Sequence, residues 1–123
     1  MLTTIAYGLA VVLNVAVTVI GVRFFVAPRV AAAGYGVPAK EEGDAAYLNV
    51  KAVRDTTFGI LGLTLIAFAG TQAAALFMLV SVLAPLGDTV IVLRHGGTKA
   101  TAFGIHFATA VFMVADAALL FTI

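Results

Sequence analysis

The chain contains four long apolar segments, and these constrain its fold more than any motif does. They lie at approximately residues 3–26, 50–69, 73–93 and 100–123, separated by more polar stretches. A helix needs about 20 mostly apolar residues to cross the hydrocarbon core of a bilayer. Each segment approaches or exceeds that length, and the mean hydropathy of the chain is +1.14. The pattern predicts four transmembrane helices.

The connections between the segments predict how these helices pack. Gly70-Thr71-Gln72 forms a tight turn between the second and third segments, and residues 94–99 join the third to the fourth. Short connections make successive helices antiparallel neighbours. We therefore expect one all-α transmembrane domain over residues 1–123, an up-down-up-down four-helix bundle. Its abundant Ala and Gly residues let helix backbones approach closely in lipid.

The composition excludes several classes of protein. Hydrophobic residues make up 63% of the chain and charged residues 11%, whereas a soluble domain carries about a quarter charged residues. The absence of cysteine excludes disulfides, thiolate catalysis and Cys-ligated metal centres. Because the net charge is only +1 and no dense basic run occurs, we expect no nucleic-acid partner. No motif indicates a cofactor.

The basic residues predict the orientation of the bundle. All seven belong to residues 27–49 and 94–99 or to the adjoining helix turns: Arg23, Arg29, Lys40, Lys51, Arg54, Arg94 and Lys99. Cytoplasmic loops carry an excess of Lys and Arg. We therefore expect both loops in the cytoplasm, both termini outside, and the protein in the inner membrane of the cell. The first segment lacks a basic region before it and a cleavage site after it, so we interpret it as a retained span.

Residues 27–49 are rich in turn signals. The stretch Gly34–Pro38 contains Gly and Pro at a density that interrupts regular structure. A charged run follows it, with Lys40, Glu41, Glu42 and Asp44. Asn49 is a suitable N-cap, so we expect the second helix to begin at Val50.

Polar side chains recur at similar depths in the predicted helices. From the helical rise of about 1.5 Å per residue, Asp88 lies roughly 9 Å and His106 roughly 10 Å from the cytoplasmic helix ends. On the same measure, Asn14 lies roughly 13 Å from that end, while Arg54 and Asp55 lie close to it. Ionisable groups are costly in hydrocarbon, so those that remain usually face the protein interior and carry function. The sequence therefore predicts a polar pocket in the cytoplasmic half.

The third segment contains an interruption next to Asp88. In Ala84-Pro85-Leu86-Gly87-Asp88, the proline removes one helical hydrogen bond and the glycine loosens the helix further. Carbonyl groups freed at membrane depth must be satisfied by protein or by water in a cavity. We interpret this segment as the wall of a partly hydrated recess.

These residues indicate acid–base chemistry. Asp88 and His106 are the candidate pair, because both side chains can transfer protons. Arg54 is the third candidate catalytic residue, since it would neutralise Asp88 or hold an anionic substrate oxygen. The candidate substrate-binding residues are Asp55, His95 and Asn14. No close spacing such as His-x-x-x-His supports a metal site, and we expect none.

Each candidate also has a purely structural interpretation. Arg54 and Asp55 suit a solvated ion pair at a helix start. Arg94 and His95, followed by two glycines, suit a basic helix end, and His106 suits a hydrogen bond between helices.

The remaining polar residues have structural readings too. Asn14 suits a hydrogen bond that holds helices together. Asp88 suits a salt bridge with Arg54 or Arg23. Asp116 lies near the opposite end of the bundle, where we expect it to face water.

Several motifs, taken in order, carry a resemblance to a protein family. They are Tyr35-Gly36-Val37-Pro38, then Val50-Lys51-Ala52-Val53-Arg54-Asp55 running into Gly59-Ile60-Leu61, then Gly87-Asp88, Arg94-His95-Gly96-Gly97 and His106. The set resembles a domain-of-unknown-function family of small four-span membrane proteins, similar in outline to the DoxX-like group. The likeness covers nearly the whole chain. It implies the four-span fold and no established activity.

Two functions fit these observations. The first is the binding or conversion of a lipophilic small molecule from the bilayer, by proton transfer, isomerisation or cyclisation. The second is a non-catalytic accessory or assembly subunit of a larger membrane complex. We expect contact with membrane lipids, and the small interior suits a homodimer or a membrane partner protein. A proton-coupled carrier is disfavoured, because no inverted repeat is visible and the polar groups do not cross the bilayer.

Overall fold

The computed structural model describes residues 1–40, 43 and 45–123, and within these residues it contains helices and no strand. Glu41, Glu42 and Asp44, which belong to the predicted charged run, lie outside the described residues. Four helical stretches are long and apolar enough to cross a membrane: Leu2–Val26, Ala45–Ala69, Thr71–Arg94 and Lys99–Thr122. The predicted all-α four-helix bundle is confirmed.

The helical segments follow one another in this order. The first span is α1 (Leu2–Val26), and α2 (Pro28–Tyr35) follows it outside the spans. The second span joins α3 (Ala45–Thr64) to the π-helix η1 (Leu65–Ala69). The third span consists of α4 (Thr71–Ser81) and α5 (Leu83–Arg94). The fourth consists of α6 (Lys99–Thr101), the π-helix η2 (Ala102–Phe107) and α7 (Ala108–Thr122).

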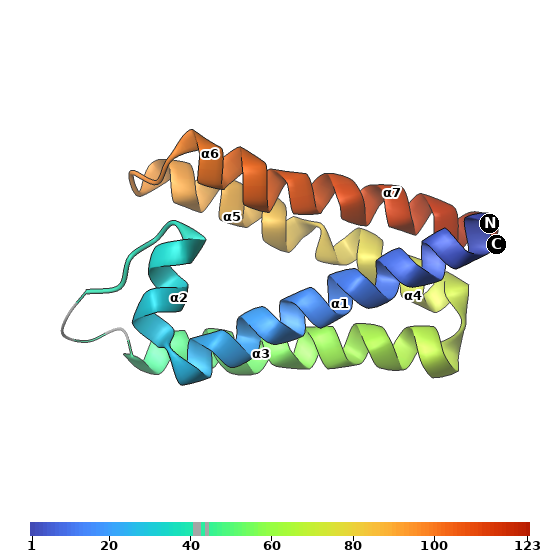
Figure 1. The fold of residues 1–123 in the computed structure, drawn as a ribbon, viewed down its shortest axis with the longest axis horizontal. Coiled ribbons are helices and arrows are strands. Elements are labelled where there is room, and N and C mark those ends of the chain that lie inside the picture. Colours follow the sequence, from blue (N-terminus) through green and yellow to red (C-terminus); the bar gives the residue numbers. More distant parts are fainter. Residues whose placement is uncertain (41–42, 44) are drawn as a thin grey trace.

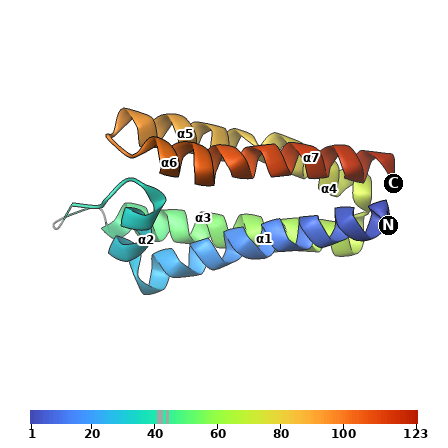
Figure 2. The same cartoon turned by 45° about the horizontal axis from the view of Figure 1, so that its top comes forward.

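The spans are arranged as two antiparallel pairs. Helix α1 packs mainly on α3, and α4 packs mainly on α7. Figure 1 shows both termini at one end of the bundle, with α2 and α6 at the other. Figure 2 shows the pair of α1 and α3 below the pair formed by the third and fourth spans. We call the end that carries α2 and α6 the loop end.

Helices α1 and α3 approach closely because glycines face polar side chains across their contact. A Cβ atom at Gly59 would overlap Thr18 Oγ1 and would lie 2.6 Å from the Asn14 carbonyl oxygen. Gly62 receives the Asn14 side chain and Gly21 receives Thr56 in the same way. Small residues permit such close backbone approach in lipid. We call this set the α1–α3 seam: Asn14, Thr18, Gly21, Thr56, Gly59 and Gly62.

Two predicted boundaries are wrong. The second span begins at Ala45, so Asn49 lies inside α3 and does not cap it. Gly70 alone forms the turn between the second and third spans, with φ 91°, and α4 begins at Thr71. Hydropathy marks the lipid-embedded part of a helix, whereas the helix itself continues into water where its residues favour it.

The predicted loop after the first span contains a helix, α2, that hydropathy did not reveal. Pro28 opens it at a position where the missing N–H costs nothing. Gly36 ends it with φ 100° in the left-handed region. The Val37 N–H donates to the Ala32 carbonyl at 3.2 Å and the Gly36 N–H to the Ala33 carbonyl at 3.1 Å, the two bonds of a Schellman motif.

This short helix is fixed across the loop end. Ala31 and Ala32 are buried against Phe24 of α1 and Ala52 of α3. At the other side, a Cβ atom at Gly36 would meet Val92 of α5 at 3.0 Å. The packing on both sides directs Tyr35, the last residue of α2, into the bundle.

The interruption predicted in the third span is present, but it lies one turn before Pro85. Helix α4 ends at Ser81 and α5 begins at Leu83. Pro85 has no N–H to donate to the carbonyl four residues earlier, which belongs to Ser81. The missing hydrogen bond accounts for the break between α4 and α5. The π-helix η2 of the fourth span packs against α5, the part of the third span after this break.

Candidate functional site

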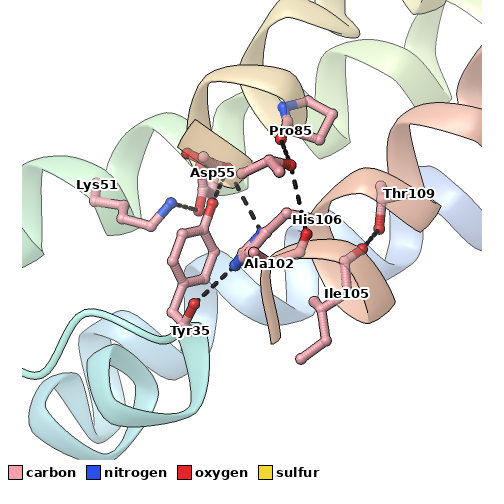
Figure 3. Close-up of polar contacts among 10 residues, drawn as sticks. Tyr35, Lys51, Asp55, Pro85, Ala102, Ile105, His106 and Thr109 are labelled. Carbon is pink, nitrogen blue, oxygen red and sulfur yellow. Dashed lines mark hydrogen bonds and ion pairs between the residues drawn. The ribbon is translucent and has the colours of Figure 1, made fainter. Parts of the chain in front are cut away.

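Three side chains from distant parts of the sequence meet where α2, α5 and η2 converge. The Tyr35 phenol donates a hydrogen bond to Asp88 Oδ2. His106 Nδ1 lies 4.0 Å from the same oxygen, and His106 Nε2 lies 2.7 Å from the Tyr35 backbone carbonyl oxygen. Figure 3 shows Tyr35 reaching from α2 to His106 on the fourth span. We call this set the Tyr35–Asp88–His106 cluster.

The hydrogen-bond partners fix where the protons lie. A carbonyl oxygen only accepts, so His106 Nε2 carries the hydrogen and Nδ1 faces the Asp88 carboxylate. Burial, and then the nearby Asp88 carboxylate, raise the pKa of the Tyr35 phenol, so the phenol remains a donor. Asp88 therefore has one firm donor in Tyr35 and, at 4.0 Å, one ring nitrogen of His106 that lies beyond hydrogen-bond distance.

The Tyr35 ring is enclosed by three other side chains. Its centroid lies 4.2 Å from that of the His106 ring and 5.8 Å from that of Phe24, which meets it edge to face. The Lys51 ammonium lies 4.2 Å from the Tyr35 ring centroid. A cation over an aromatic face is attracted to the electrons of the ring. Both the ring and the hydroxyl of Tyr35 are thus held by specific partners.

Asp55 forms its ion pair with Lys51, and not with Arg54 as the structural interpretation of the sequence expected. Lys51, one turn earlier on α3, lies 2.8 Å from Asp55 Oδ2. Figure 3 shows this pair beside Tyr35. Arg54 forms no ion pair with Asp55, Asp88 or any other acidic residue that the structure describes. Adjacent positions on a helix point about 100° apart, so Arg54 and Asp55 do not face the same partner.

Asp88 also borders an open recess between α3 and α5. The recess measures about 440 Å³. Its lining residues are Tyr47, Val50, Lys51, Arg54, Asp55, Phe58, Ala84 and Asp88. Arg54 contributes to this lining rather than to the buried cluster. The Asp88 side chain, 26% exposed, is the residue common to the recess and the cluster.

The other two candidate binding residues lie elsewhere. His95 is exposed at the loop end, where its Nδ1 lies 2.9 Å from the Ile91 carbonyl oxygen. Asn14 belongs to the α1–α3 seam and donates to the Ala10 carbonyl at 2.8 Å. The structure therefore brings Asp88 and His106 together, leaves Arg54 and Asp55 at the recess, and separates His95 and Asn14 from both.

The expectation for Asp116 is wrong. Its side chain is fully buried, at 0% exposure, and neither carboxylate oxygen has a hydrogen-bond partner among the described residues. It neighbours Ala117, which together with Leu120 packs on α1 and α4. The position of a residue along a helix gives its depth, whereas its position around the helix decides whether it faces water.

Sequence reasoning missed Tyr35 and Lys51. Tyr35 lies in a stretch whose glycines and proline indicate a turn, and the signal that could have identified it is the Pro28 start and Gly36 stop of a short helix. Thr89 was also missed. Its hydroxyl donates to the Pro85 carbonyl at 2.8 Å and lies 3.5 Å from the Ala102 carbonyl oxygen of η2.

These features define a small four-span α-helical membrane protein with an ionisable cluster inside the bundle. The model of a family described as a domain of unknown function (DUF4267) matches residues 14–120. The chain belongs to that family, and the resemblance stated from its motifs is confirmed. No curated protein and no solved structure matches the chain.

Proposed function

We propose that this protein binds or converts a lipophilic small molecule at the Tyr35–Asp88–His106 cluster. The observation that carries the proposal is a carboxylate and an imidazole from different spans, 4.0 Å apart, inside a mostly apolar bundle. Both lie at irregular places, because Asp88 follows the interruption within the third span and His106 belongs to the π-helix η2. Such helix irregularities are frequent at functional sites.

The pair has the groups that an isomerisation or a cyclisation requires. Asp88 would remove a proton from one atom of the substrate and pass it to the lone pair of His106 Nδ1. His106 would then return that proton to a different atom of the substrate, so that both side chains end in their starting states. Their separation is longer than a hydrogen bond, as is common before a substrate is bound.

The recess between α3 and α5 supplies a route from the bilayer to Asp88. Val50, Phe58 and Ala84 provide its apolar lining. Arg54 at its rim would hold a partly anionic oxygen of an arriving molecule. In this role Arg54 orients the substrate, while Asp88 and His106 perform the chemistry.

The loop end faces the cytoplasm in this proposal, because every Lys and Arg residue lies in or beside the two loops at that end. The absence of native cysteine makes the orientation simple to test. Thr98→Cys in the loop after α5 should react with a membrane-impermeant maleimide only after the cells are opened. Thr3→Cys, near the N-terminus, should react in intact cells once the outer permeability barrier is opened. The reverse pattern would invert the orientation.

Native mass spectrometry on gently extracted protein tests the proposed function. The wild type should carry a discrete lipophilic molecule that is absent from Asp88→Asn. Asp116→Asn is the matched control, because it changes a carboxylate that lies within the bundle but outside the cluster, and it should retain the molecule. Bulk phospholipid alone in all three samples would sink the proposal.

An accessory or assembly subunit is the second candidate. The observation that favours it is the exposure of the spans, since only 17% to 28% of the most apolar window of each is buried within the chain. Such a surface can face lipid or a partner protein. This function would be favoured over the first if one partner protein co-purified with the chain in detergent. Substitution of lipid-facing residues should then remove that partner and should not remove a small molecule.

A further inference from the structure

The Tyr35 side chain occupies a position that has the form of a ligand site. Four elements other than α2 contribute one contact each. Asp88 of α5 accepts the hydroxyl proton, and His106 of η2 covers the ring at 4.2 Å between centroids. Phe24 of α1 meets the ring edge to face, and Lys51 of α3 lies over it. The pocket around this side chain thus recognises a ring and a hydroxyl group at once.

The charges around the position limit what else would fit there. A carboxylate would be repelled by Asp88, and the Lys51 ammonium that could attract it is already paired with Asp55 at 2.8 Å. The same ammonium, 4.2 Å from the ring centroid, opposes a cationic group in the place of the ring. A plain hydrocarbon would leave the Asp88 carboxylate without its donor, which is costly in a buried place. A neutral ring that bears a hydroxyl donor satisfies both Asp88 and Lys51.

The same carboxylate can be approached without passing through α2. Asp88 lines the recess between α3 and α5, next to the apolar side chains of Phe58 and Ala84. A flat molecule from the bilayer would therefore meet Asp88 with its polar end leading and its apolar part still in the recess. Rotation of the Tyr35 side chain would then free its place, while the Schellman end of α2 stays fixed.

We propose that the ligand of the Tyr35–Asp88–His106 cluster is a lipophilic ring that carries a phenol or enol hydroxyl, and that Tyr35 occupies its place when no ligand is bound. This inference rests on the proposed function and names its ligand class. It makes Tyr35 an internal competitor whose hydroxyl and ring are exchanged for those of the ligand.

Binding of 4-octylphenol to the full chain in detergent tests the proposal, with 4-octylanisole as the matched probe that lacks the hydroxyl donor. Tyr35→Phe keeps the ring but loses the bond to Asp88, so the internal competitor is weakened. Loss of a hydrogen bond to a charged group corresponds to about a tenfold change or more. We therefore expect Tyr35→Phe to bind 4-octylphenol roughly tenfold more tightly than the wild type does.

Two controls isolate the site. Tyr7→Phe changes a tyrosine of α1 outside the cluster and should bind 4-octylphenol as the wild type does. Asp88→Asn, added to Tyr35→Phe, should reduce the preference for 4-octylphenol over 4-octylanisole, because an amide oxygen accepts a weaker hydrogen bond than a carboxylate does. Equal binding of the two probes by Tyr35→Phe, or no gain over the wild type, would overturn the inference and leave Tyr35 as a structural lock.

A second measurement covers the case in which Tyr35→Phe does not fold. In the wild type, 4-octylphenol should raise the unfolding temperature more than 4-octylanisole does, and Asp88→Asn should reduce that difference. If native extracts contain an Asp88-dependent ligand without a ring hydroxyl, the inference fails while the proposed function stands. If no molecule, 4-octylphenol included, binds in an Asp88-dependent way, both fail.

Discussion

The α1–α3 seam and the Tyr35–Asp88–His106 cluster both place polar side chains inside an apolar bundle, but they do so in opposite ways. In the seam, Asn14 and Thr18 bond to carbonyl groups of their own helix and fill notches above glycines. In the cluster, Asp88 and His106 bond across elements that are far apart in the sequence. The seam lies between regular helices, whereas the cluster lies beside an interrupted span and a π-helix.

The difference teaches how to read a polar residue in a transmembrane helix. A polar side chain whose hydrogen bonds end on its own helix, opposite a glycine, is explained by packing alone. A carboxylate whose donor comes from another element is expensive to bury, and the fold is shaped around it. Asp116 fits neither description, because it is buried without a described partner.

The largest effect on stability is expected at the seam. Gly59→Ala would place a methyl group against backbone atoms, the Asn14 carbonyl oxygen at 2.6 Å and the Thr18 nitrogen at 2.8 Å. Backbone cannot rotate away, so we expect a loss of about 3 kcal/mol, the upper part of the usual range for overpacking. Gly8→Ala is the control on α1, since nothing lies within 4 Å of a Cβ there. Equal unfolding temperatures for the two variants would show that α1 and α3 are not in close contact at Gly59.

A change of opposite sign is expected at Asp116. Asp116→Leu replaces a fully buried carboxyl group that lacks a described partner with an apolar side chain of similar size. Removing an unsatisfied buried polar group should stabilise the bundle by about 1–2 kcal/mol in thermal or denaturant unfolding. A clear loss of stability would instead indicate that Asp116 has a partner that matters, and would place it beside Asp88 as a second polar site.

A smaller loss is expected from Asp88→Asn. The amide oxygen can still accept the Tyr35 hydrogen bond, but without the negative charge the bond is weaker, so we expect a cost of about 1 kcal/mol. His106→Gln in the same background should add little if the two residues act as one unit. Additive costs in this double-mutant cycle would show that Asp88 and His106 contribute to stability independently of each other.

The smallest effect concerns alkaline pH. Burial raises the pKa of the Tyr35 phenol above its ordinary value of 10.0. A raised pKa favours folding most below that ordinary value, and the contribution is lost as the pH rises toward the folded pKa. At about pH 11, where an unperturbed tyrosine is largely ionised, the ultraviolet spectra of wild type and Tyr35→Phe should show the same amount of phenolate. An extra phenolate in the wild type while it is still folded would show that Tyr35 is accessible to base.

Much of the fold follows from hydropathy. Four apolar segments and their short connections predict the spans, since a helix must satisfy its backbone internally in lipid. The helix α2 and the π-helix η2 do not follow, because neither is long or strongly patterned. Packing against the rest of the bundle decides their form.

The candidate site could be predicted from the sequence only in part, for the same reason. Depth along a helix predicts that Asp88 and His106 lie level, and the structure places them 4.0 Å apart. Depth says nothing about the direction in which a side chain points, so Asp116 was misjudged, and Asn14 lies in the α1–α3 seam and not in the cluster. Tyr35 escaped notice because its role depends on how α2 folds back across the loop end.

The most direct test of the contrast between seam and cluster is to measure ligand retention against stability for four variants. Native mass spectrometry and thermal unfolding would be applied to Asn14→Ala, Thr18→Ala, Asp88→Asn and His106→Gln. We predict that Asn14→Ala and Thr18→Ala lower the unfolding temperature yet keep the bound lipophilic molecule, while Asp88→Asn and His106→Gln lose it at a smaller cost in stability. If retention simply followed stability in all four variants, the cluster would be packing like the seam, and the proposed function would be contradicted.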